Sequence, residues 1–152
     1  MRNLFLCLMA IGATSAGAQS KDNGDPRDYF RNGYRQAIKY CIDRTPTYAW
    51  EAKCSQAVKA KGAYYNPVVL KMCDKTTNWG TMVECLEAGA GITITTAARV
   101  CDKSTNWDIM NRCLAAIGHM YYTPEEITNC DRFSQWEPTI ACFASAGIPY
   151  RR

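Results

Sequence analysis

Apolar residues recur at steps of three and four along most of the chain, the spacing that places side chains on one face of an α-helix. The first such run follows Asp25-Pro26, a typical helix start, and comprises Phe30, Tyr34, Ile38 and Cys41. After a break at Thr45-Pro46, the second run comprises Trp50, Cys54, Ala57 and Val58 and stops near Gly62. This pattern predicts two consecutive helices joined by a short turn.

The helix pair is the first of four similar units. Cys101-Asp-Lys-Ser-Thr-Asn-Trp107 has a near copy at Cys73-Asp-Lys-Thr-Thr-Asn-Trp79 and a looser copy at Cys130-Asp-Arg-Phe-Ser-Gln-Trp136. The first cysteines fall at 41, 73, 101 and 130, so the periods are 32, 28 and 29 residues. Such periods are typical of stacked supersecondary units. The sequence therefore predicts an all-α fold of four tandem αα-hairpins over residues 29–147, stacked as a short solenoid.

The only β-prone run, residues 91–96, is interpreted as a linker that ends in a threonine N-cap. The fourth unit opens with Thr123-Pro124-Glu125-Glu126, the pattern of a capping box with proline at the first helical position. Residues 19–28 are predicted to be a disordered linker and residues 148–152 a short frayed tail.

The first 18 residues have the pattern of a secretory signal peptide. Arg2 precedes an apolar run over residues 4–12, and Ala16-Gly17-Ala18 is a small-residue cleavage pattern. A lipoprotein signal at Cys7 is the alternative, but too few residues precede it to form the apolar region. We therefore expect cleavage after Ala18 and a periplasmic or secreted protein with no membrane insertion after cleavage.

The predicted mature chain has 134 residues, enough for one small domain, with eight cysteines. An even cysteine count in an exported chain indicates a disulfide framework. Its 17 basic and 14 acidic residues are spread along the chain, so the charge gives no reason to expect a nucleic-acid partner.

The cysteine spacing predicts which residues pair. Within each unit 12, 11, 11 and 11 residues separate the two cysteines, whereas the gaps between units vary from 15 to 18. A disulfide has fixed geometry, so the near-constant gap predicts Cys41–Cys54, Cys73–Cys85, Cys101–Cys113 and Cys130–Cys142. This pairing requires the second helix of each unit to start later than Thr77, Thr105 or Ser134, because an earlier start would carry its cysteine too far along the helix axis.

Several aromatic residues are candidates for binding. Trp79, Trp107 and Trp136 recur at the start of each second helix, where they either present a regular face to sugars or peptides or, as we expect, pack within the stack. Of the pairs Tyr64-Tyr65 and Tyr121-Tyr122, Tyr65 and Tyr122 fit a hydrophobic staple. The exposed contact is therefore expected at Tyr64 and Tyr121.

The sequence carries no convincing catalytic signal. Asp74, Asp102 and Asp131 recur in every later unit, which favours turn formation over acid–base chemistry. His119 is the single histidine and has no accompanying nucleophile motif. No metal-binding, haem or other cofactor motif is present, and the carboxylates that a hydrolase would need are Glu84, Glu87, Glu125 and Glu126.

The hairpins with internal disulfides over residues 29–147 resemble the Sel1-like repeat family, in particular the secreted cysteine-rich helical repeat proteins of bacteria. The runs Cys85-Leu86-Glu87-Ala88 and Cys113-Leu114-Ala115-Ala116, each followed by glycine, look similar to exported cysteine-rich repeat proteins of predatory bacteria. The resemblance implies localisation and no activity.

These patterns favour a non-enzymatic exported binding or scaffold protein whose partner is a protein or a cell-envelope component. The first alternative is a small secreted enzyme inhibitor or effector acting through Tyr121-Tyr122. The second is a cell-wall hydrolase, which would require two carboxylates in one cleft.

Overall fold

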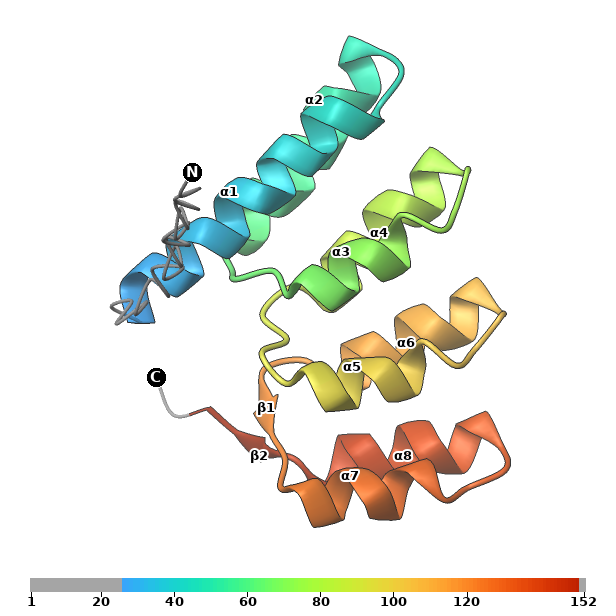
Figure 1. Cartoon of the computed structure of the whole chain (residues 1–152). Helices are drawn as coiled ribbons and strands as arrows, with labels where there is room; N and C mark the ends of the chain where they lie inside the picture. The colour runs from blue at the N-terminus through green and yellow to red at the C-terminus, as the bar shows by residue number, and fades with distance from the viewer. Residues whose placement is uncertain (1–25, 151–152) are drawn as a thin grey trace, which may run out of the picture.

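The computed structural model describes residues 26–150, with only the backbone described for residues 26–31. The predicted signal peptide, its cleavage site, residues 19–25, the side chain of Phe30 and Arg151-Arg152 lie outside this description. Four helical hairpins stack in one row, with the turns inside the hairpins along one edge and the linkers between hairpins along the opposite edge (Figure 1). The predicted all-α repeat fold is confirmed.

Each hairpin consists of two antiparallel helices. Their bounds are α1 Pro26–Arg44, α2 Tyr48–Lys61, α3 Pro67–Cys73, α4 Trp79–Gly89, α5 Thr95–Cys101, α6 Trp107–Ile117, α7 Pro124–Asp131 and α8 Trp136–Ala146. The first helix begins at Pro26, inside the segment that was predicted to be a linker over residues 19–28. Successive even-numbered helices pack on one another more extensively than successive odd-numbered helices do.

Side-chain caps fix several helix starts. Thr47, Asn66, Asn78, Asn106 and Thr123 each accept a backbone N–H of the first turn. Thr123 and Glu126 form the predicted capping box. The predicted threonine N-cap of α5 is wrong, because Ile94 occupies that position without a side-chain hydrogen bond. Thr95 Oγ1 instead accepts a hydrogen bond of 3.0 Å from Asn66 Nδ2, which connects the N-cap of α3 to the first residue of α5.

Disulfides join the two helices of every hairpin, in the four pairs that the spacing predicts: Cys41–Cys54, Cys73–Cys85, Cys101–Cys113 and Cys130–Cys142. Their Cα–Cα distances are 5.4–5.6 Å. In the last three hairpins the second helix begins at a tryptophan, six residues before its cysteine, and so carries that cysteine about 9 Å along the helix axis. The turn extends past the end of the first helix by enough to bring the two cysteines level.

One hydrophobic core runs through the stack. Seven of the eight cysteines of the described chain are fully buried in it together with residues from every hairpin, among them Val58, Met82, Leu86, Leu114 and Phe143. Each hairpin contacts chiefly its neighbours, as in other repeat proteins. The core is therefore continuous along the stack, although each contact joins residues of the same hairpin or of adjacent hairpins.

Two short strands close the C-terminal end, where the sequence predicts a frayed tail. Strand β1 (Met120–Tyr121) lies in the last linker, and β2 (Ile148–Pro149) follows α8. They pair antiparallel, with Met120 opposite Pro149 and Tyr121 opposite Ile148 (Figure 1). The tail prediction is therefore wrong for residues 148–150, because this pairing folds them back onto the linker edge.

Candidate functional site

The recurring aspartates connect neighbouring hairpins. Asp74 and Asp102 are the C-caps of α3 and α5, and Asp131 is the last residue of α7. Each carboxylate pairs with a cation of the preceding hairpin, in the ion pairs Arg44–Asp74, Lys75–Asp102 and Lys103–Asp131. The repetition of Asp-Lys after the first cysteine thus has a structural reason beyond the turn formation that the sequence predicts.

The ion pair nearest the N-terminus includes a tyrosine. Tyr40 donates a hydrogen bond of 3.3 Å to Asp74 Oδ1, and Arg44 Nε lies 2.5 Å from the same oxygen. Burial raises the pKa of Tyr40 to about 12, the negative charge of Asp74 adds to the increase, and Arg44 opposes it. This phenol therefore remains a neutral donor to the carboxylate at neutral pH.

The tryptophans contribute to the stack. Trp79, Trp107 and Trp136 are the first residues of α4, α6 and α8, and each is partly buried against the core. This placement agrees with the expected packing role. A binding role for the three rings remains a prediction.

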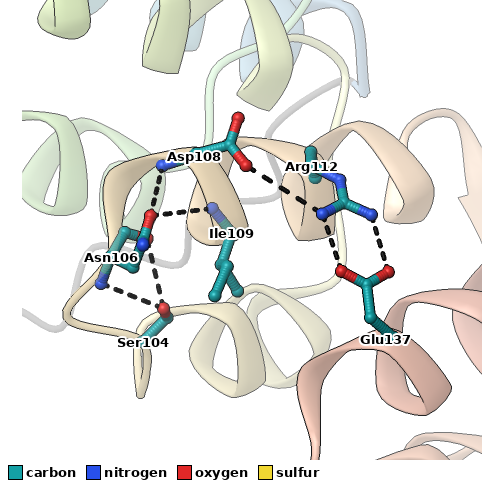
Figure 2. Close-up of polar contacts among 6 residues, drawn as sticks. All are labelled: Ser104, Asn106, Asp108, Ile109, Arg112 and Glu137. Atoms are coloured by element: carbon teal, nitrogen blue, oxygen red, sulfur yellow. Dashed lines mark hydrogen bonds and ion pairs between the residues drawn. The ribbon is translucent and has the colours of Figure 1, made fainter.

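Polar contacts at α6 connect the third hairpin to the fourth (Figure 2). Asn106 Oδ1 caps the helix by accepting the backbone N–H groups of Asp108 and Ile109. Arg112 donates two hydrogen bonds, of 2.7 and 2.8 Å, to the carboxylate of Glu137 at the start of α8. The hydrogen bond from Arg112 lowers the pKa of Glu137, and the positive charge of the guanidinium lowers it further. Arg112 is therefore turned towards the fourth hairpin.

The tyrosine pairs differ from expectation at one position. Tyr121 is half exposed on β1, and Tyr65 and Tyr122 are buried, as expected. Tyr64 is also buried, so its predicted exposure is wrong. A Cβ at residue 33 would lie 2.3 Å from Tyr64 Cδ2, so Gly33 is what allows this ring to pack directly against α1.

A chamber of about 560 Å³ opens at the linker edge of the stack. Its wall combines α1, the end of α2, three linkers and the C-terminal segment, through residues that include Tyr34, Lys61, Tyr64, Thr93, His119 and Tyr150. This volume lies in the range of small-ligand sites, which are lined mainly by apolar and aromatic side chains with a few polar groups. We call this cavity the tyrosine chamber.

A second cavity of about 460 Å³ adjoins the chamber and shares Lys61 and His119 with it. It lies over α4 and α6, and its wall includes Glu84, Glu87, Asn111 and Arg112. We call it the helix valley, and the two cavities together the linker groove. The groove therefore provides aromatic surface at one end and carboxylates at the other.

Contacts between the linkers and the C-terminal segment fix the chamber wall. Gly91 donates its N–H to Tyr64 O at 2.8 Å, and Tyr150 donates its N–H to His119 O at 3.1 Å. The hydroxyls of Tyr150 and Thr93 lie 2.5 Å apart. Gly91 has φ +80° and lies under the imidazole of His119, so closely that a Cβ there would be 1.9 Å from His119 Cε1.

A buried hydroxyl lies in the linker between α2 and α3. Tyr65 is fully buried, and its hydroxyl has no hydrogen-bond partner among residues 26–150. Burial raises its pKa, and both Glu87 of the valley and Tyr34 of the chamber add to the increase.

The carboxylates considered for hydrolysis lie in different hairpins. Glu84 and Glu87 are exposed on α4 in the second hairpin, whereas Glu125 and Glu126 begin α7 in the fourth. Glu126 Oε2 accepts the backbone N–H of Thr123 at 2.6 Å. In the part of the chain that the structure describes, no group of three or more histidine, cysteine or acidic side chains is arranged to hold a metal ion.

The fold and its cross-links define the chain as a disulfide-bonded α-hairpin repeat protein. Four disulfides indicate an oxidising, extracellular-type environment. None of the helices within residues 26–150 combines the length and the apolar character needed to cross a membrane. Comparisons of the chain with protein-family models, curated proteins and solved structures gave no match. The resemblance to Sel1-like repeats stays a prediction.

Proposed function

We propose that this chain is a non-enzymatic exported binding protein, directed by residues 1–18 to the periplasm or the outside of the cell. Its stacked hairpins present a rigid surface to a protein or cell-envelope partner. The observation that carries the proposal is the linker groove, whose wall is assembled from several hairpins and fixed by backbone hydrogen bonds. Four disulfides support both the export and the rigidity.

The groove suits binding because the backbone of its wall is held in place by hydrogen bonds between the linkers and the C-terminal segment. Rigid aromatic and polar groups lose little conformational entropy when a partner binds. The recurring aspartates support the same conclusion, since each serves the stack through an ion pair and none is singled out for chemistry. The best candidates for direct contact are Lys61, His119 and Tyr150 in the groove.

A small secreted inhibitor or effector is the second candidate, and Tyr121 favours it. This ring is 50% exposed on β1 and neighbours the exposed Ile148 across the strand pair. An exposed aromatic residue on a fixed strand pair is a suitable anchor for insertion into the cleft of an enzyme. A cell-wall hydrolase is the weakest candidate, because the paired glutamates belong to different hairpins.

The test is affinity capture from envelope extract with oxidised, tagged protein lacking residues 1–18, together with sedimentation with purified cell wall. Three variants are compared: Lys61→Glu with His119→Ala in the groove, Tyr121→Ser on β1, and Lys71→Glu as an exposed control on α3. Loss of a stoichiometric partner or of wall binding in the groove variant alone supports the proposal. Loss in Tyr121→Ser alone supports the inhibitor, and cleavage of the wall preparation would contradict a non-enzymatic role.

A further inference from the structure

The two carboxylates in the helix valley are available to a ligand. Glu84 and Glu87 are three residues apart on α4, a spacing that places them on the same side of the helix. Both are exposed and line the valley, and neither forms an ion pair with any residue in the range 26–150. Two cations share the valley wall: Arg112 is already engaged by Asp108 and Glu137, and Lys61 forms no ion pair with either glutamate.

The two ends of the groove favour different chemical groups. At the chamber end, Tyr34 and Tyr150 provide accessible aromatic surface for an apolar or aromatic side chain, and the buried Tyr64 supports the wall behind them. At the valley end, Glu84 and Glu87 favour a cation. Between them, Lys61 lines both cavities and is placed to donate to carbonyl oxygens of a chain that passes from one to the other.

We propose that the linker groove binds a peptide segment of a partner protein, with an aromatic or large apolar side chain in the tyrosine chamber and a nearby lysine or arginine against Glu84 and Glu87. This inference rests on the proposed binding function and specifies its ligand. A neutral glycan offers no charge to the two carboxylates, and an acidic glycan is repelled by them. A peptide with an aromatic or large apolar residue near a lysine or arginine matches both ends of the groove.

The experiment is selection of random heptapeptides displayed on phage against the immobilised, oxidised protein lacking residues 1–18. The dissociation constant of the most enriched peptide is then measured as a free synthetic peptide. We expect enriched peptides to pair an aromatic or large apolar residue with a nearby lysine or arginine. Exchange of Glu84→Gln and Glu87→Gln together should weaken binding of this peptide about tenfold, since both exposed charge pairs with the peptide are lost. The matched control is Glu125→Gln on α7, which should leave the affinity unchanged.

Two results would overturn the inference: enrichment of acidic or uncharged peptides, or equal affinity for the wild type and the glutamine variant. An absence of enriched peptides also overturns it. If envelope capture still depends on Lys61 and His119 in any of these cases, the binding function stands and only the ligand assignment fails. If capture is absent as well, both proposals fail.

Discussion

Lys103 Nζ lies 2.5 Å from Asp131 Oδ1, an ion pair between the third hairpin and the fourth. Arg44–Asp74 and Lys75–Asp102 occupy the corresponding positions between earlier hairpins. In each pair the cation lies two or three residues after the first cysteine of one hairpin. The carboxylate comes directly after the first cysteine of the next hairpin. A chain that repeats these positions repeats its interface, so the sequence period also sets the register of stacking.

The first prediction concerns this ion pair. Because Lys103 is more than half exposed, Lys103→Ala should lower the free energy of unfolding by no more than about 1 kcal/mol, and less at high salt. A double-mutant cycle with Asp131→Ala, measured by urea unfolding at low and high salt, isolates the coupling between the two residues. Lys71→Ala on the exposed side of α3 is the control. A coupling energy of zero at low salt would show that the Lys103–Asp131 pair does not stabilise the stack and at most fixes the register between the third and fourth hairpins.

The second prediction distinguishes internal from terminal disulfides. Replacement of both Cys101 and Cys113 with alanine removes a cross-link in the middle of the stack and should cost about 3 kcal/mol of unfolding free energy. The same change at Cys130 and Cys142 affects a hairpin with one neighbour only. It should therefore unfold α7 and α8 locally and leave the first three hairpins folded.

Circular dichroism and limited proteolysis check this difference. In the terminal variant we expect partial loss of helicity and new cleavage after residue 118, whereas the internal variant should unfold at lower urea concentration as a whole. Full cooperative unfolding of both variants at the same urea concentration would contradict nearest-neighbour stabilisation.

The third prediction concerns Tyr122, whose hydroxyl proton is shared between Phe143 O at 2.8 Å and Ala116 O at 3.3 Å, the shorter bond being to Phe143. Its ring also contacts the Phe143 ring edge-on, with the ring centroids 5.3 Å apart. Tyr122→Phe retains the ring and removes both hydrogen bonds, so it should cost about 1–2 kcal/mol of unfolding free energy. Tyr121→Phe is the matched control, because the neighbouring ring is half exposed. Equal stability of the two variants would contradict the assigned role.

The fourth prediction is a loss of stability at alkaline pH. Burial, with a contribution from Glu126, raises the pKa of Tyr122 to about 12, and burial beside Asp74 does the same for Tyr40. An unfolded tyrosine titrates near pH 10. Between about pH 10 and 12 the unfolded chain therefore releases protons that the folded chain retains, so the unfolding free energy should fall as the pH rises through this range.

Urea unfolding at a series of pH values from 8 to 11 checks this direction. Stabilisation by these phenols is fully present below pH 10, so the unfolding free energy of the wild type should start to fall near pH 10. The Tyr122→Phe variant should show a shallower fall over the same range. A parallel fall in both proteins would show that other groups cause the alkaline destabilisation.

Local patterns in the sequence predicted much of the fold. The steps of three and four, the recurring tryptophans and the constant cysteine gap all lie within one hairpin, and they gave the hairpins and the pairing of Cys73 with Cys85. The ion-pair partners are about 30 residues apart, so their contact depends on the register between hairpins. The repeated Asp-Lys is the trace of this contact in the sequence, but taken by itself it predicts only a turn.

The linker groove depends on features that no single segment contains. Tyr64 is buried because Gly33, on a helix far earlier in the chain, leaves room for its ring. Tyr150 reaches the chamber because a strand pair of two residues each folds the tail back, and strands this short have no detectable alternation. Only the stacked arrangement brings Lys61, Thr93 and His119 to one cavity.

The last prediction tests the chamber wall at Gly91. Its φ of +80° is unfavourable for any other residue, and a Cβ there would overlap the His119 ring. Gly91→Ala should therefore cost at least about 1–2 kcal/mol of unfolding free energy, from both backbone strain and the overlap. His119→Ala alone should cost little, because His119 is exposed. When His119 is already alanine, the added Cβ at residue 91 no longer overlaps an imidazole, and only the backbone strain remains. Urea unfolding should therefore show a smaller loss of unfolding free energy for Gly91→Ala in this background. An equal cost in both backgrounds would mean that the imidazole does not lie against Gly91, and the wall of the tyrosine chamber would then have to be redrawn.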